Sequence, residues 1–253
     1  MSKIVWGINP VLEVLKNSPT LIEEIWIESK NLFGKKYQII ERAKKLEISL
    51  RLVPSEKFKP PKLPPQVNTQ GVVAYLSEFN YQSLEEIVEN WEKRKEKPLV
   101  LLLDEIEDPQ NLGSILRSAE AGGVHGVIIP KRRSCEVTGT VIKVSSGAAF
   151  NLPIVKITNL KHAISFFKEK GLFIIGLTPH TKTSIYEINL DQPLALMVGN
   201  EERGIKKSNL ELCDFLAKIP MKGKIESLNV AVATAIAIFE VLRQRSYLER
   251  TTS

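Results

Sequence analysis

From residue 99 onward, short apolar runs alternate with segments of helical spacing. Each run is continuous rather than interrupted by polar residues, which is typical of strands buried on both faces. Helical spacing appears between the runs at 114–121 and 161–170, and again from Val230 onward. This pattern predicts an α/β domain with a helix-covered parallel sheet, in which ligands bind beyond the carboxyl ends of the strands. The runs are 99–103, 127–129, 172–177, 194–198 and 215–219.

Residues 1–76 predict a smaller α/β unit. Its first helix is expected to be opened by Asn9, with Pro10 at the first helical position. The prolines in 59–65 exclude regular structure there, because proline lacks an N–H donor. The expected elements are helices at 10–16 and 37–46 and strands at 24–27, 48–53 and 71–76.

A polar bridge, 77–98, separates the two patterns and contains a predicted helix at 84–94. We therefore place the domain boundary near residue 80. Residues 1–80 form one domain with its linker, and residues 81–253 form the other.

The net charge of +6 is concentrated in the first part of the chain. Residues 1–76 hold 12 Lys and Arg against 7 Asp and Glu, so they carry +5 and the remainder carries +1. Two interpretations stand: a polyanionic partner that meets this part, or a merely soluble basic surface.

Composition narrows the class of protein. The apolar stretch 230–239 is shorter than the roughly 20 residues of a membrane span, and the N-terminus lacks the apolar region of a signal peptide. Cys135 and Cys213 lie far apart, and the three histidines show no metal-binding spacing. We expect a cytoplasmic protein with no metal and no membrane partner.

Three loops that join a strand to a helix carry the candidate chemistry. In the first, 104–117, Asp108 or Asn111 caps the following helix, and Arg117 suits either phosphate recognition or a surface salt bridge. The second, 198–204, presents carboxylates between Gly199 and Gly204. It lacks the lysine of a phosphate-binding P-loop, and the chain has no Gly-x-Gly-x-x-Gly motif.

The third loop, 219–229, ends in Ser227, Leu228 and Asn229 before a small, apolar final helix. Ser and Asn side chains commonly cap such a helix by accepting a hydrogen bond from an unpaired N–H. The other interpretation is that these residues form part of a ligand or substrate site.

Taken together, the ordered loops resemble the three motifs of the SpoU (TrmH) RNA 2′-O-ribose methyltransferases. The motifs are 111–119, 197–204, and 219–223 with 227–233. The front part, with 7–15 and 70–74, is similar to the L30e-like substrate-binding domain that precedes the catalytic part in the bacterial 23S rRNA guanosine methyltransferases of this family.

That resemblance implies a parallel sheet whose C-terminal part forms a deep trefoil knot, an exception to the rule that chains avoid knots. It also implies S-adenosylmethionine as methyl donor, RNA (23S rRNA) as substrate, and a homodimer. The implied cofactor-binding residues are Thr178, Gly199, Ile219 and Leu228.

The resemblance further implies catalytic roles for Asn111, Arg117, Glu201, Ser227 and Asn229. Because the pKa of arginine exceeds about 12, we expect Arg117 to bind phosphate and stabilise the alkoxide rather than act as a base. Glu201 or a phosphate then receives the proton, and Asn111 orients Arg117 by a hydrogen bond. Ser227 and Asn229 are expected both to cap the last helix and to face the cofactor and ribose.

Three alternatives stay open. A tRNA guanosine methyltransferase of this family generally lacks the front domain, whereas a 23S rRNA adenosine methyltransferase shares it. The third alternative, a non-catalytic RNA-binding protein, is opposed by the intact set of motif residues.

Overall fold

The computed structural model describes residues 3–17, 19–64, 66–77, 79–225 and 227–251. The chain divides into two compact units. The first contains residues 1–80 and also 136–151, a segment that the expected boundary assigns to the second domain. The second contains 81–135 and 152–253.

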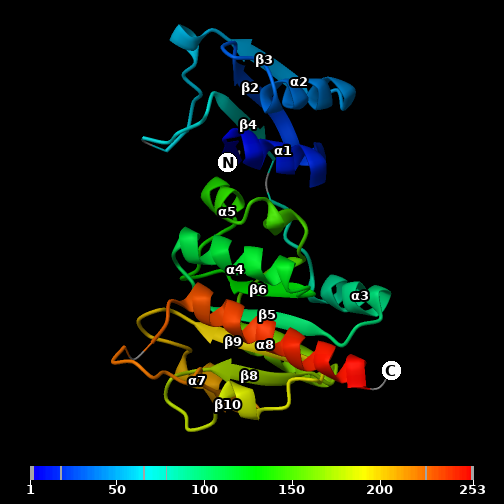
Figure 1. The fold of residues 1–253 in the computed structure, drawn as a ribbon, viewed down its shortest axis with the longest axis vertical. Coiled ribbons are helices and arrows are strands. Elements are labelled where there is room, and N and C mark those ends of the chain that lie inside the picture. The colour runs from blue at the N-terminus through cyan, green and yellow to red at the C-terminus, as the bar shows by residue number, and fades with distance from the viewer. Residues whose placement is uncertain (1–2, 18, 65, 78, 226, 252–253) are drawn as a thin grey trace. The chain divides into compact units, whose positions relative to one another are not determined.

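The first unit is built on a mixed four-stranded sheet in the order β1-β4-β2-β3. Strand β4 runs antiparallel to both of its neighbours, while β2 and β3 are parallel. Helices α1 and α2 pack together beside this sheet, and α5 contacts β1 (Figure 1). The elements are β1 (Lys3–Trp6), α1 (Ile8–Asn17), β2 (Ile22–Glu28), α2 (Lys35–Lys45), β3 (Ser49–Val53), β4 (Val72–Leu76) and α5 (Gly139–Val144), with 3-10 turns at Pro19–Leu21, Ser55–Lys57 and Ala148–Phe150.

The second unit is built on a six-stranded, wholly parallel sheet in the order β10-β8-β9-β5-β6-β7. This confirms the predicted parallel sheet. The elements are α3 (Leu84–Arg94), β5 (Leu99–Asp104), α4 (Pro109–Ala121), β6 (Gly126–Pro130), β7 (Ile154–Ile157), α6 (Leu160–Glu169), β8 (Phe173–Leu177), a 3-10 turn at Ile185–Glu187, β9 (Leu194–Gly199), α7 (Lys207–Leu210), β10 (Phe215–Ala217) and α8 (Val230–Thr251).

Helices cover both faces of the parallel sheet. Every residue of β5 and β9 is buried, as their continuous apolar runs predict. Val100 and Leu102 belong to a core cluster with residues of α3 and α6. Helix α8 packs against α4 and crosses in front of the sheet (Figure 1). No helix in the described ranges is long and apolar enough to span a membrane.

Three helices differ from the expectation at their ends or in their packing. Helix α1 begins at Ile8, so Asn9 lies inside it, and the Asn9 side chain accepts a hydrogen bond from Lys35 Nζ at 2.8 Å instead of capping. Helix α4 begins at Pro109, five residues before the predicted segment, because Asp108 caps it through Gln110 N–H at 3.0 Å. The bridge helix α3 buries Trp91 and three aliphatic side chains, so it is a core helix of the second unit.

Candidate active site

The three predicted loops all follow strand ends at one edge of the parallel sheet. Gly199, the last residue of β9, pairs in register with Asp104, the last residue of β5. At the other side of β9, the end of β8 is joined to the end of β10 by a hydrogen bond from Thr178 N–H to the Ala217 carbonyl at 2.9 Å. Residues that are distant in the chain therefore follow neighbouring strands.

Hydrogen bonds between side chains connect the three loops directly. Asn111, in the first turn of α4, donates from Nδ2 to Glu201 Oε1 in the loop after β9. The Asn111 side-chain oxygen accepts from Asn229 Nδ2 at 2.9 Å. One amide thus holds Glu201 on one side and Asn229 on the other, and the three predicted site residues form a single network.

Asn229 also caps the last helix, as predicted. Its side-chain oxygen accepts from the backbone N–H groups of Ala231 at 3.0 Å and Val232 at 3.3 Å. Ser227 is exposed and forms no hydrogen bond with any described residue, so the expectation that it caps the helix is wrong. The cap lies one residue before Val230, where the helix starts, and Ser227 is two residues too early for that position.

Arg117 lies apart from the asparagine network. Its side chain is exposed on α4 and has no hydrogen bond or ion pair among the described residues, so the expected bond to Asn111 is wrong. Six residues along a helix turn through about 600°, which leaves the two side chains roughly 120° apart around the axis. Arg117 is left open to solvent.

The four predicted cofactor residues surround the same strand ends. A Cβ on Gly199 would lie 2.2 Å from backbone atoms of Gly204 and Ile205, so only glycine permits the tight turn after β9. Thr178 is buried, whereas Ile219 and Leu228 are half-buried. Neither Ile219 nor Leu228 makes a backbone hydrogen bond to a residue that the structure describes.

Two acidic residues at the end of β5 were not predicted. The buried Asp104 carboxylate accepts from the Lys206 N–H at 2.8 Å and from Asn209 Nδ2 at 2.9 Å. Glu105 is buried next to it and has a positive φ of 60°. A usable signal was present, because both acids directly follow an apolar strand at the ligand-binding edge.

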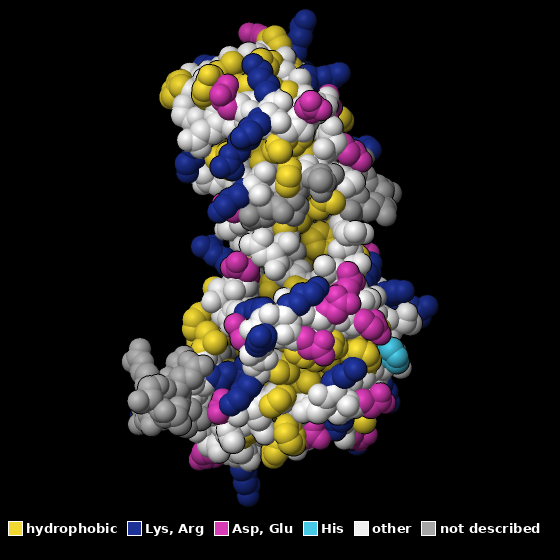
Figure 2. Space-filling view, turned by 90° about the vertical axis from the view of Figure 1, so that its right-hand side faces the viewer, with side chains coloured by type: hydrophobic (Ala, Val, Ile, Leu, Met, Phe, Trp, Pro, Cys, Tyr) yellow, Lys and Arg dark blue, Asp and Glu magenta, His cyan; other side chains and the backbone are white. Residues whose placement is uncertain are grey.

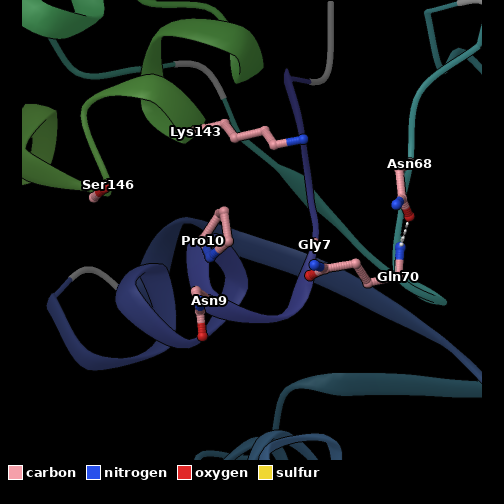
Figure 3. A pocket seen from close by; sticks show the side chains of 7 residues that line it. All are labelled: Gly7, Asn9, Pro10, Asn68, Gln70, Lys143 and Ser146. Atoms are coloured by element: carbon pink, nitrogen blue, oxygen red, sulfur yellow. Dashed lines mark hydrogen bonds between the residues drawn. The ribbon is translucent and has the colours of Figure 1, made fainter.

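The first unit has a polar pocket of its own, with a volume of about 270 Å³. It lies between the start of α1, the segment before β4 and the α5 region (Figure 3). Gln70 closes one side by accepting the Ile8 N–H at 2.9 Å, and its own N–H donates to Asn68 at 3.0 Å. The lining residues are Gly7, Asn9, Pro10, Asn68, Gln70, Lys143 and Ser146.

The surface charge is mixed. On the face shown in Figure 2, Lys and Arg side chains lie among Asp and Glu side chains and do not form one continuous basic surface. The excess of +5 in residues 1–76 therefore acts on this face through scattered groups. A polyanion would contact them individually rather than lie on a uniform patch.

Comparison with known proteins identifies the class. Residues 98–239 match the SpoU rRNA Methylase family, and residues 4–82 match the RNA 2′-O ribose methyltransferase substrate-binding family. Together these matches define an RNA 2′-O-ribose methyltransferase with an N-terminal substrate-binding part. The chain belongs to the SpoU rRNA methylase family.

Two relatives match nearly the whole chain. The 23S rRNA (guanosine-2′-O-)-methyltransferase RlmB of Coxiella burnetii is 37% identical over 253 residues, covering 97% of this chain and 98% of that protein. YacO of Bacillus subtilis, which is named as a TrmH family tRNA/rRNA methyltransferase, is 39% identical over 243 residues, or 95% of each chain.

Solved structures share the fold. The SpoU methyltransferase AviRb from Streptomyces viridochromogenes superposes with a TM-score of 0.80 at 25% identity, covering 97% of this chain and 90% of that one. AviRb in complex with its cofactor AdoMet gives 0.79 at 24% identity, covering 96% and 90%.

Proposed function

We propose that this protein transfers a methyl group from S-adenosylmethionine to the ribose 2′-hydroxyl of a guanosine in 23S rRNA. The single observation that carries the proposal is the Glu201–Asn111–Asn229 network, which joins three loops at the ligand-binding edge of the sheet. The RlmB relative supports the choice of substrate, since its name specifies a 23S rRNA guanosine.

The residues at the strand ends fit S-adenosylmethionine. Thr178, Gly199, Ile219 and Leu228 carry no charge, and the unpaired backbone groups of Ile219 and Leu228 suit an adenosine. We assign these four residues to holding the cofactor. When bound, S-adenosylmethionine supplies a methyl group made electrophilic by its positively charged sulfur.

The remaining site residues orient the hydroxyl and accept its proton. We assign Glu201, held by Asn111, or an RNA phosphate as proton acceptor. Asn229 fixes Asn111 and thereby the direction of the carboxylate. The free guanidinium of Arg117 is open to bind an RNA phosphate and stabilise the alkoxide, and exposed Ser227 is assigned a contact with the ribose.

We further propose a division of labour in which residues 1–80 bind RNA as an L30e-like domain and residues 81–253 catalyse methyl transfer. The family matches at 4–82 and 98–239 support this division. The polar pocket of the first unit offers amides, a hydroxyl and the Lys143 cation, which are groups that bind RNA. A role in rRNA modification places the protein in the cytoplasm.

We also infer a deep trefoil knot in the catalytic part. Support comes from the 178–193 loop, which bonds to two segments that follow it in the chain. Ile185 N–H donates to the Lys218 carbonyl at 2.9 Å, and Leu190 N–H donates to Gln244 Oε1 at 2.8 Å. The loop therefore lies against both the chain leaving β10 and the distal part of α8.

A homodimer is proposed from the outer surface of α8. Val232 and Phe239, about two turns apart on that helix, are 48% and 50% exposed. An apolar stripe of this kind on the last helix suits an isologous contact with a second copy.

Labelled S-adenosylmethionine supplied with separate 23S rRNA, 16S rRNA and tRNA tests the proposal. Wild-type protein should label 23S rRNA at one guanosine ribose. Label in tRNA alone, or at an adenosine, would replace the substrate assignment. RNA binding without any affinity for S-adenosylmethionine in calorimetry would favour a non-catalytic protein.

Arg117 is tested separately. Because its side chain has no partner among the described residues, Arg117→Ala should leave the melting temperature unchanged while kcat falls by about 100-fold or more. Arg42→Ala, on an exposed face of α2, is the control and should keep full activity. Near-normal activity of Arg117→Lys would remove the role assigned to the guanidinium.

A further inference from the structure

Glu105 is a buried carboxylate at the ligand-binding edge that the proposed chemistry does not use. It directly follows β5, is 5% exposed and has a φ of 60°, in the region that favours glycine. A glutamate adopts this backbone conformation only when surrounding contacts hold it there. Its side-chain contacts therefore call for a physical explanation.

Three cations converge on this carboxylate. Lys206 Nζ lies 2.6 Å from Glu105 Oε1, Arg133 Nη1 lies 3.9 Å from the same oxygen, and Arg203 Nη2 lies 4.0 Å from Oε2. The cations come from two loops, one after β6 and one after β9. Their side chains are 50%, 66% and 53% exposed, so each faces the carboxylate and still presents its charge to solvent.

Backbone contacts fix both loops beside the same strand end. The Glu105 carbonyl accepts from Asn200 Nδ2 at 3.1 Å, and Asp104 accepts the Lys206 N–H. The β6 loop is tied by Cys135 N–H, which donates to the Ile106 carbonyl at 2.8 Å. Because Asn200 and Lys206 flank the turn that carries Glu201, the three cations lie close to the catalytic network.

The charges in this cluster do not cancel. Three cations face two carboxylates, Glu105 and Glu107, the latter 2.6 Å from Arg203 Nη2, so the cluster carries a net +1. Two arginine forks and a lysine with open outer surfaces match the oxygens of a phosphate diester.

We propose that Arg133, Arg203 and Lys206 form a contact for a phosphate of the RNA backbone beside the target ribose. Glu105 is the positioning residue that gathers these cations before RNA arrives. This inference rests on the proposed function, since it assigns part of the RNA path to the same catalytic edge.

A simple electrostatic role for Glu105 makes the opposite prediction. If the carboxylate only lowers the local positive charge, Glu105→Gln should strengthen RNA binding and leave kcat/KM equal or higher. If it positions the cations, the same change should lower kcat/KM for RNA even though the net charge becomes more positive.

The experiment compares steady-state methylation of a 23S rRNA transcript by four variants, together with the salt dependence of RNA binding. The double variant Arg203→Ala/Lys206→Ala should raise KM for RNA roughly tenfold and reduce the slope of log K against log salt by about 1.4 to 1.8, or 0.7 to 0.9 for each lost phosphate contact. Its kcat and its affinity for S-adenosylmethionine should stay near wild type. Lys207→Ala removes the same charge from an adjacent exposed position that has no ion pair with a described residue, and should change KM less than twofold.

Glu105→Gln should lower kcat/KM about fivefold or more. Glu105→Gly provides a second test that is tolerant of folding problems, because glycine suits the positive φ, and it should show the same loss with an unchanged melting temperature. Equal KM values for the double variant and Lys207→Ala, or higher kcat/KM in both Glu105 variants, would overturn the inference. Lack of methylation by the wild-type protein would instead count against the proposed function.

Discussion

The two sheets of this molecule collect polar side chains in different ways. In the second unit all six strands are parallel, so every strand ends at one edge, and Asn111, Glu201 and Asn229 meet there from three loops. In the first unit β4 runs against β1 and β2. Its polar pocket is assembled from a helix start, an extended segment and a distant part of the chain.

The difference shows why the second unit is easier to interpret chemically. A parallel sheet places loops that are remote in sequence side by side at a predictable edge, whereas a mixed sheet has loops at both ends. The catalytic residues could therefore be found from loop positions alone. The lining of the first unit's pocket could not, since Lys143 and Ser146 lie more than 130 residues from Gly7.

The largest effect is expected at the glycine turn of the parallel edge. In Gly199→Ala the new Cβ would lie 2.2 Å from the backbone of Gly204 and Ile205, so the turn must open. We expect loss of S-adenosylmethionine binding in calorimetry and at least a ~1000-fold fall in activity, about 4 kcal/mol. Gly223→Ala is the matched control, because a Cβ there meets nothing within 4 Å. Activity in Gly199→Ala comparable to that control would contradict the turn's role.

A second glycine tests the first unit in the same way. A Cβ on Gly139 would lie 1.7 Å from the Ile4 carbonyl oxygen, so α5 must move away from β1. Gly139→Ala should destabilise the first unit by about 3 kcal/mol and weaken RNA binding in a filter assay. Its affinity for S-adenosylmethionine should be retained. If both glycine variants lose cofactor binding equally, the proposed division of labour between the units is wrong.

The amino edge of the parallel sheet is expected to respond to pH. Burial, reinforced by the nearby Arg94 charge, lowers the pKa of His125 from 6.5 to about 4. Its ring accepts the Leu99 N–H and contacts Glu96. Protonation therefore favours the unfolded chain: this contribution is complete above pH 6.5 and is lost as the pH falls toward 4.

The corresponding effect is up to about 3 kcal/mol, from a difference of 2.5 pKa units at 1.36 kcal/mol each. Urea unfolding at pH 7.5 and 4.5 should show a smaller loss of stability in His125→Gln than in wild type. Identical pH dependence in the two proteins would exclude His125 as a source of acid sensitivity.

The smallest effect separates capping from chemistry at the start of α8. Asn229→Ala should lower the free energy of unfolding by about 1 kcal/mol, because it removes the acceptor for two backbone N–H groups. Ser227→Ala should change it by less than about 0.5 kcal/mol. Both should reduce kcat under the proposed function. A stability loss in Ser227→Ala equal to that of Asn229→Ala would restore Ser227 as a cap.

Much of the secondary structure followed from local pattern. The bridge helix was predicted at the same bounds as α3, and β5 and β9 were each predicted to within one residue, since continuous apolar runs and capping residues are local signals. Strands β1 and β7 and helix α5 were not predicted. Each is short, and α5 is stabilised by its contact with β1 rather than by a strong pattern of its own.

Site residues divided along the same line. Asn111, Glu201 and Asn229 were predicted, and the structure joins them. The bond between Asn111 and Arg117 was wrong because helical rotation, not distance along the chain, decides which side chains meet. Glu105 was missed because its importance depends on three cations brought from two distant loops.

By itself, the sequence determined the alternation of apolar strands and helices, the parallel sheet, the edge at which chemistry collects and the residue types available there. Those features depend on local periodicity and on the single direction of parallel strands. Only the tertiary structure decided which polar atoms pair, which cations surround Glu105 and which segment completes the first unit. Such pairings depend on strand order and helix rotation, which bring together residues that no local pattern connects.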